Sequence, residues 1–332
     1  MKRVLIFILL AFAIDRGLGF VLQHANGHNL TGDRGGSLNC ALSRDAEILI
    51  LGSSRAQYHI IPSVLNQQLS LVSYNAGLKG QDFLYSVMLF DLWKARHRAP
   101  RAIVMTTDIE SLTERGTEVA TAQIVAPYLD QSPLVREILY SASPFKRFEF
   151  LSRTYRFNGE LFSMARHMLS HPSPGFDGFA VSPGALNPTT DTGVLNALDQ
   201  DQTAMEMAQR PFSERKLKYL RDLAEESARN STRLFLLHTP LFRQDPRAHQ
   251  LWMERLRAII AELPGVEVID ICQATHPEIF FRPELFRNLN HLNVRGAEIL
   301  TALLADELRE RLAATPGRHD SATAGATTAA SK

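Results

Sequence analysis

The chain has 332 residues, of which 45% are hydrophobic and 21% charged, the balance of a folded globular protein and too apolar for a disordered one. Its 36 Lys+Arg against 35 Asp+Glu give a formal net charge of +1, which argues against nucleic acid as a partner, because such binding depends on neutralising phosphates. Two cysteines exclude a disulfide-stapled miniprotein and a four-thiolate zinc site. The sequence also lacks the glycine-rich phosphate loops of nucleotide-binding enzymes.

The start of the chain predicts a membrane anchor. Two basic residues precede an apolar run of eleven residues, Val4 to Ile14, which Asp15 and Arg16 interrupt. A run of this length fits the hydrophobic region of a signal peptide, whereas spanning hydrocarbon takes about 20 residues. We favour an uncleaved anchor at residues 1–22, with the rest of the chain on the periplasmic or extracellular side. The alternative is a buried first helix of a cytosolic protein.

Two segments flank the predicted domain. Residues 23–45, in which Gly and Asn are frequent, predict a linker. Residues 313–332 are mostly Ala, Thr, Ser and Gly and predict a disordered tail. Export would permit a disulfide between Cys40 and Cys272, although the sequence alone does not place the two side by side.

Residues 46–312 alternate predicted strands with predicted helices. Short apolar runs predict buried strands at 46–51, 71–74, 102–105, 233–237 and 266–271. Amphipathic stretches predict helices at 83–96, 213–229, 247–263 and 294–312. The alternation predicts an α/β domain of three layers, flavodoxin-like, in which helices cover both faces of a five-stranded parallel sheet. The interval from about 113 to 211 does not fit the alternation and predicts a helical insertion that overhangs the site.

Three polar clusters fall beyond strand ends or at a helix entry, where parallel sheets place their ligand sites. Residues 52–55 follow the first strand, and a serine there either caps the next helix or acts as a nucleophile. Residues 75–80 follow the second strand, and their glycines permit backbone N–H groups to hold an oxyanion. Residues 288–293 precede the last helix and contain His291, although a lone histidine is more often a surface or capping residue.

Together, the clusters resemble those of the SGNH/GDSL hydrolase superfamily. In that family a serine in a Gly-Asp-Ser block follows strand one, a glycine loop follows strand two, and an Asp-x-x-His block precedes the last helix. The resemblance is greatest to a bacterial, membrane-anchored branch that modifies cell-surface glycans and includes the D-alanyl transfer protein of teichoic acid and alginate-type O-acetylation proteins. It is carried by the segments ILILGSSRAQYHIIP, SYNAGLKGQDF and HLNVRGA, and it covers about residues 46–112 and 213–310.

The resemblance implies catalytic roles for individual residues. Ser54 matches the nucleophile and His291 the general base, while Gly80 and the backbone N–H of Ser54 match the oxyanion hole. The family's triad Asp falls at Asn288, whose amide can orient an imidazole but cannot neutralise the imidazolium that forms. Asp270, at the end of the fifth strand, is the alternative acid.

Three further residues are candidate substrate contacts. Arg55 follows the predicted nucleophile and either holds an anionic substrate group or pairs with Asp82 or Asp108. Asp108 lies near the position where the family carries an oxyanion Asn, and it either binds a sugar hydroxyl or caps the next segment. Asn75 is a candidate for lining the site.

Two hypotheses from different classes follow. The first is a serine esterase or O-acyltransferase that acts on an acylated cell-envelope polysaccharide, with no metal or organic cofactor and with a membrane acyl-donor protein as a candidate partner. The second is a catalytically idle member of the fold that binds glycan or scaffolds an envelope assembly, and the replaced Asp and oxyanion Asn motivate it. A flavodoxin-like fold without this chemistry is a third interpretation, which requires Ser54 and His291 to lie well apart.

Overall fold

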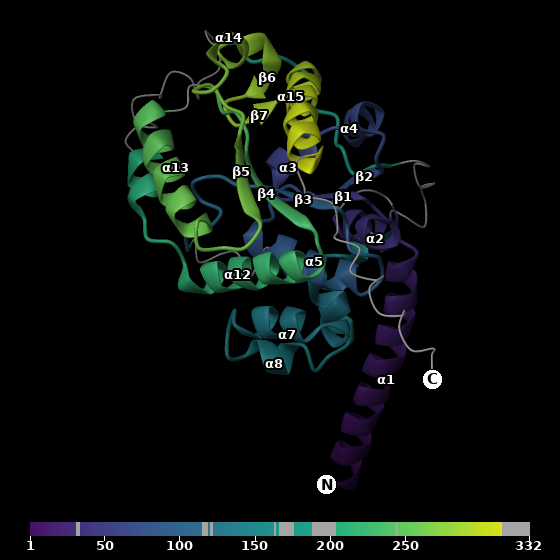
Figure 1. Cartoon of the computed structure of the whole chain (residues 1–332). Coiled ribbons are helices and arrows are strands. Elements are labelled where there is room, and N and C mark those ends of the chain that lie inside the picture. The colour runs from purple at the N-terminus through teal and green to yellow at the C-terminus, as the bar shows by residue number, and fades with distance from the viewer. Residues whose placement is uncertain are drawn as a thin grey trace, which may run out of the picture.

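The computed structural model describes residues 1–30, 34–114, 119, 122–162, 164–165, 176–187, 204–242 and 245–313. A five-stranded parallel sheet in the order β2-β1-β3-β4-β5 forms its centre (Figure 1). The strands are β1 (Ile48–Leu51), β2 (Ser73–Asn75), β3 (Ala102–Thr106), β4 (Arg233–His238) and β5 (Val266–Asp270). Each overlaps a strand that the sequence predicts, and the predicted parallel α/β sheet is confirmed.

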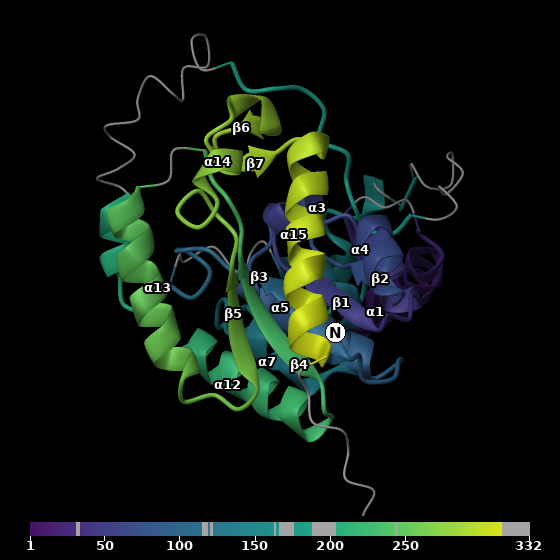
Figure 2. The same ribbon diagram turned by 45° about the horizontal axis from the view of Figure 1, so that its top comes forward.

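Helices cover both faces of the sheet, because successive strand residues point to opposite sides and both sides are apolar. In β1, Ile48 and Ile50 belong to one core cluster while Leu49 and Leu51 belong to the other. The first cluster is covered by α3 (Ser54–His59), α4 (Pro62–Leu69) and α15 (Val294–Ala313), and the second by α2 (Gly35–Ser43), α5 (Phe83–Lys94), α12 (Glu214–Arg229) and α13 (Pro246–Ile260) (Figure 2). Burying one such branched side chain contributes roughly 1.5–3 kcal/mol.

An antiparallel hairpin precedes the last helix. Its strands are β6 (Phe286–Asn288) and β7 (His291–Leu292), and the short helices α14 (Pro277–Phe280) and η3 (Pro283–Leu285) lead into it. β7 contacts α3, so the hairpin brings residues near the end of the chain to the turn that follows β1.

The N-terminal helix α1 (Lys2–Gly27) is long and apolar enough to cross a membrane, with a mean hydropathy of 2.2 over its most apolar window. Its one acidic residue, Asp15, is hydrogen-bonded to the domain. The Asp15 carboxylate accepts hydrogen bonds from the Ser152 hydroxyl (2.6 Å), the Arg153 N–H (2.9 Å) and the Thr154 hydroxyl (2.8 Å). The helix is therefore fixed to the domain at mid-length and continues past the predicted boundary at residue 22.

Residues 23–45, predicted as a linker, are largely helical in the structure. Residues 31–33 lie outside the described residues. α1 occupies the first part of the predicted linker, and α2 buries Leu38 and Ala41 in the core. The Asn39 amide donates hydrogen bonds to the Asn26 and Asn29 carbonyls and ties α2 to the end of α1. Asn and Gly serve buried backbone contacts here, a use that composition does not distinguish from a flexible linker.

The helical part of the predicted insertion lies away from the hairpin β6–β7 (Figure 1). Its described elements are η1 (Ala122–Gln131), α7 (Pro133–Tyr140), α8 (Lys146–Glu149) and η2 (Thr154–Phe157). η1 and α7 pack on α5, and η2 packs on α1. These elements extend the helical layer instead of overhanging the predicted site.

A second described part of the insertion, residues 176–187, does run beside that site. The Asn75 N–H at the end of β2 donates to the Asp177 carbonyl (3.0 Å), and the Ala180 N–H donates to the Gln57 carbonyl in α3 (2.9 Å). The Leu186 N–H then donates to a carbonyl of β6 (2.7 Å). This segment therefore crosses from the β2 edge to the hairpin. The predicted tail, beyond residue 313, lies outside the described residues.

The two cysteines do not form a disulfide. Cys40 lies in α2 within the helical layer, whereas Cys272 follows β5 at an edge of the sheet, and both are buried thiols outside any disulfide. The pairing that export would permit is therefore absent.

Candidate active site

In the turn from β1 into α3, the consecutive residues Ser53 and Ser54 have different roles. Gly52 has φ +140°, and a Cβ there would lie 2.0 Å from the Thr106 hydroxyl, so only glycine fits. Ser53 is the N-cap of α3, and its hydroxyl accepts the Arg55 N–H (3.5 Å). The Ser54 hydroxyl is therefore not needed for capping. The Ser54 N–H lies in the first helical turn, where amides have no acceptor within the helix.

Ser54 and His291 lie in hydrogen-bond contact although 237 residues separate them. The distance between Ser54 Oγ and His291 Nε2 is 2.8 Å. Asn288 Oδ1 accepts the backbone N–H groups of Asn290 (3.0 Å) and His291 (2.9 Å) and lies 3.1 Å from His291 Nδ1. Because this oxygen can only accept, Nδ1 carries the ring proton and donates it. The lone pair of Nε2 is then free to accept the Ser54 hydroxyl proton, as a general base must.

The surroundings of His291 disfavour its charged form. Burial lowers the pKa of His291 to about 4, and the positive charges of Arg55 and Arg287 act in the same direction. Asn288 orients the ring but adds no negative charge. The Tyr58 ring meets the imidazole edge-on, with 5.4 Å between ring centroids. The imidazole is therefore neutral at pH 7, and the imidazolium formed during proton transfer receives little support.

A second histidine, which sequence reasoning missed, joins the two elements that carry Ser54 and His291. His59, at the end of α3, is fully buried. Its Nε2 accepts the Leu292 N–H of β7 (3.0 Å), and its Nδ1 lies 3.2 Å from the Thr239 hydroxyl. Burial holds the pKa of His59 well below its usual value, so the ring is neutral. Nothing in the local sequence predicts this contact, because its partner is a backbone amide distant in the chain.

Gly80 has the backbone conformation that glycine favours. Its φ is +76° at the third position of a turn in which the Gln81 N–H donates to the Leu78 carbonyl (3.1 Å). The preceding N–H, of Lys79, donates to the Gln57 side chain on α3 (3.0 Å), which attaches this loop to the helix that begins with the serine. The predicted role of the Gly80 N–H as an oxyanion donor stays a prediction.

Arg55 pairs with Asp108, the second of its two expected partners. Arg55 Nη1 lies 3.8 Å from Asp108 Oδ2. Asp108 Oδ1 also accepts the Glu110 N–H (2.9 Å) and the Ser111 hydroxyl (3.0 Å), so Asp108 caps its own loop. Burial by itself would raise the pKa of Asp108, but the Arg55 charge and these hydrogen bonds outweigh it and lower the pKa. The pair places an ionised carboxylate and a guanidinium next to the predicted nucleophile.

Asn75 has a structural role in this fold. Its side chain is buried, and its amide donates to the Ala56 (2.6 Å) and Ile60 (2.8 Å) carbonyls. Its oxygen accepts the Gly77 N–H (3.0 Å). Both amide hydrogens are therefore engaged within the protein and unavailable to a ligand, whereas the sequence suggested a substrate contact.

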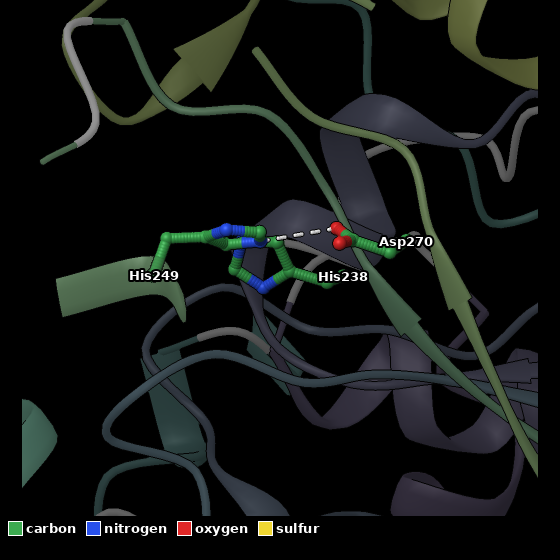
Figure 3. A group of neighbouring side chains, drawn as sticks. All are labelled: His238, His249 and Asp270. Atoms are coloured by element: carbon green, nitrogen blue, oxygen red, sulfur yellow. Dashed lines mark hydrogen bonds and ion pairs between the residues drawn. The ribbon is translucent and has the colours of Figure 1, made fainter. Parts of the chain in front are cut away.

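Asp270 does not serve as the acid for His291, which corrects the alternative assignment. Its Oδ1 lies 3.2 Å from His249 Nε2, and Asn288 occupies the position next to the ring nitrogen of His291. Figure 3 shows Asp270 grouped with His249 and His238. Both Asn288 and Asp270 are at strand ends, and position along the chain does not reveal which of them the hairpin brings to the imidazole.

Comparisons with known proteins do not identify a family or an activity for this chain. No family model matches the chain, and no curated protein matches it. A solved structure described as "a putative platelet activating factor from Streptococcus pneumonia" is 11% identical, with a TM-score of 0.39 and coverage of 94% of this chain and 99% of that chain. A likeness of this degree assigns neither a family nor an activity.

Proposed function

We propose that the protein is a serine esterase or O-acyltransferase of the SGNH type. The single observation that carries the proposal is the chain of contacts from Ser54 Oγ to His291 Nε2 (2.8 Å) and from His291 Nδ1 to Asn288 (3.1 Å). These two contacts hold the imidazole in the one tautomer that can take the serine proton. A half-buried, neutral base beside a hydroxyl at the start of a helix is the arrangement that activates a serine.

The proposed reaction proceeds through an acyl-enzyme. His291 Nε2 takes the Ser54 proton as Oγ bonds to the ester carbonyl carbon, and the carbonyl oxygen becomes an oxyanion bound by the Ser54 and Gly80 N–H groups. The imidazolium then gives its proton to the leaving alcohol as the carbon–oxygen bond breaks. Water or a sugar hydroxyl next attacks the acyl-enzyme, with His291 again acting as base, and Ser54 is regenerated.

The position of these groups in the sheet supports the SGNH-type assignment. The strand order 2-1-3-4-5 is that of flavodoxin-like folds, whose ligand sites lie where the order reverses, between β1 and β3. Ser54 follows β1, and Asp108 follows β3. The predicted nucleophile and the Arg55–Asp108 pair therefore meet at this switch point.

We assign the substrate class as an acylated cell-envelope polysaccharide. Arg55 provides a guanidinium beside Ser54 that suits the uronate or phosphate groups of such polymers. The apolar helix α1 leaves almost all of its most apolar stretch exposed, with 6% of it buried. This suits a membrane anchor with the domain on the periplasmic or extracellular side. As a transferase, the protein would receive its acyl group from a membrane acyl-donor protein.

A fluorophosphonate probe tests the proposal directly, because it reacts only with an activated serine. We expect the full chain in detergent to become labelled, with the adduct on the peptide that contains Ser54. The Ser54→Ala variant should not be labelled. Ser53→Ala is the matched control, since it removes a weak cap worth about 1 kcal/mol or less but leaves the nucleophile in place. Equal labelling of Ser54→Ala and the natural chain would contradict the proposal.

A second candidate function rests on Asn288. Because its amide supplies no charge to the imidazolium, the fold also suits an idle member that binds glycan without cleaving it. Such a protein would stay unlabelled by the probe, while its binding to an immobilised envelope polysaccharide would be the same in the natural chain and in Ser54→Ala.

The low pKa of His291 predicts an unusual pH dependence. Only the neutral imidazole accepts the serine proton, and this form persists as the pH falls until the pKa of about 4 is reached. We therefore expect the rate of probe labelling to stay level from pH 8 to pH 5 and to fall about tenfold per unit below pH 4. Circular dichroism in the same buffers separates titration from acid unfolding. A midpoint at the ordinary histidine value would show that Arg55 and burial do not act on this ring.

A further inference from the structure

Exposed apolar side chains gather at the end of the domain from which the N-terminal half of α1 projects. α7 and α8 lie at this end, opposite α14 and the hairpin β6–β7 (Figure 1). Phe145, Phe148 and Leu151, in and beside α8, are 67%, 70% and 62% exposed, and we call them the α8 patch. The Leu151 carbonyl accepts a hydrogen bond from the Arg16 side chain, so the patch adjoins the middle of α1. Large apolar side chains grouped on a surface mark a contact with a partner or a membrane.

The projecting part of α1 is too short to cross a bilayer by itself. Residues 2–14 precede the attachment at Asp15, and every one of them is exposed. At about 1.5 Å per residue they extend about 20 Å, whereas the hydrocarbon core of a bilayer is about 30 Å thick. A bilayer that α1 crosses must therefore also reach the part of the helix that lies alongside the domain.

That second half of α1 has one face for the domain and one apolar face. On the first face, Gly19 lies against Arg153, where a Cβ would collide with the arginine side chain, and Asn26 is buried. The other face carries three exposed apolar side chains, Leu18, Phe20 and Val21. Hydrocarbon over these side chains supplies the missing length, because the 19 residues from Val4 to Leu22 span about 28 Å. The bilayer surface then lies level with residues 15–22, beside which the α8 patch is held.

Basic side chains surround the α8 patch. Residues 145–156 contain four Lys and Arg against one Glu. Two of the four pair with Glu149 and Asp130, whereas Arg147 and Arg153 are exposed. Apolar rings and long cationic side chains together suit the headgroup layer of a bilayer with anionic lipid. A second copy of this chain fits the patch less well, since a two-fold contact would set the same cations against each other.

We propose that the α8 patch enters the headgroup layer of a bilayer that contains anionic lipid. The inference rests on the proposed crossing of the membrane by α1 and not on the catalytic chemistry. The domain then has two membrane contacts, α1 and the α8 patch, and the Asp15 hydrogen bonds join them. Two contacts restrict how the domain tilts about α1, which one helix crossing the bilayer does not do.

The test places a tryptophan in the α8 patch and measures whether lipid quenches it. Both natural tryptophans, Trp93 and Trp252, are fully buried, so Phe148→Trp adds an exposed reporter. The full chain is reconstituted into vesicles of phosphatidylcholine and phosphatidylglycerol, with and without brominated acyl chains. We expect the emission that Phe148→Trp adds to lie at shorter wavelength than that of a tryptophan in water and to be lost in brominated vesicles. Phe145→Trp, in the same patch, should behave alike.

Two further variants calibrate this measurement. Phe281→Trp places the reporter at the end of α14, on the opposite side of the molecule, where the natural side chain is 59% exposed. Its emission should be the same in both kinds of vesicle. Phe7→Trp places the reporter on the projecting part of α1, where the natural side chain is 72% exposed, and its emission should be lost in brominated vesicles.

The outcomes separate the α8 patch from the anchor. If Phe148→Trp behaves as Phe281→Trp does while Phe7→Trp is quenched, the proposal is overturned and the anchor assignment is kept. Emission of Phe148→Trp that is shifted but insensitive to bromine would also overturn it, because a second copy of the chain would then cover the patch. Absence of quenching in both Phe148→Trp and Phe7→Trp would remove the anchor as well. Probe labelling of Ser54 in the same vesicles tests the catalytic proposal separately.

Discussion

Replacing Ser54 with alanine is expected to lower kcat/KM for ester hydrolysis by roughly 10⁴- to 10⁶-fold. The methyl group cannot bond to the carbonyl carbon, so the acyl-enzyme cannot form and the 2.8 Å contact with His291 is lost. What activity survives would come from oxyanion binding alone. Hydrolysis of a small chromogenic acetate ester by the full chain in detergent provides the measurement, with the melting temperature recorded in parallel.

The control for this experiment is the neighbouring serine. Ser53→Ala alters the same turn and the same residue type, but among the described residues the Ser53 hydroxyl makes one weak hydrogen bond, from the Arg55 N–H at 3.5 Å. Its activity should stay within a few-fold of the natural chain. Comparable losses of hydrolytic activity in both variants would mean that the turn tolerates no substitution and that Ser54 is not the nucleophile. Undiminished activity in Ser54→Ala would rule out the nucleophile assignment.

Replacing Asn288 with aspartate is expected to raise kcat for ester hydrolysis about 10- to 100-fold. The side chain is nearly isosteric, and its oxygen would keep the two backbone N–H bonds that position it. The added charge lies about 3 Å from His291 Nδ1, and an opposite charge this close raises a pKa by roughly 1–3 units. The imidazolium is then stabilised in the transition state. The gain stays below the roughly 10⁴-fold effect known for triad acids, since Asn288 already sets the correct tautomer.

The pH profile distinguishes this mechanism from a general effect of charge. In Asn288→Asp, the acid limb of kcat/KM should move up from near pH 4 to near pH 6, because His291 becomes harder to deprotonate. Asn290→Asp is the matched control. It adds the same charge two residues away, where only its backbone N–H participates in the hairpin. A profile that moves equally in both variants, or in neither, would contradict the assigned role of Asn288.

The sequence predicted the sheet from local pattern, whereas the pairing of Ser54 with His291 was implied by the resemblance to the SGNH/GDSL superfamily. Apolar runs mark strands buried on two faces, and parallel strands direct their polar ends to one edge. The contact of His59 with β7 could not be predicted, because it joins a side chain to a distant backbone amide. Residues 23–45 were misjudged because buried turns and flexible linkers share a Gly- and Asn-rich composition.

The cluster around Asp270 was missed for a different reason. His238 directly follows the predicted strand at 233–237 and Asp270 lies near the end of the predicted strand at 266–271, and the structure pairs the two in register. The third member, His249, depends on how α13 packs against the sheet, which periodicity alone does not determine. Asp270 was therefore considered only as a partner for His291.

The attachment of α1 at Asp15 has a consequence for the proposed acyl transfer. Four hydrogen bonds from residues 152–154 to the Asp15 carboxylate attach the middle of this helix to the domain. Figure 1 shows the free end of α1 at one extreme of the molecule and the hairpin β6–β7 at the other. If α1 crosses the bilayer, the hairpin that carries His291 therefore lies at the end of the molecule opposite the free end of α1. Under the proposed transferase function, an acyl donor would then have to reach the hairpin from outside the headgroup plane, for example on a carrier or already attached to the polymer.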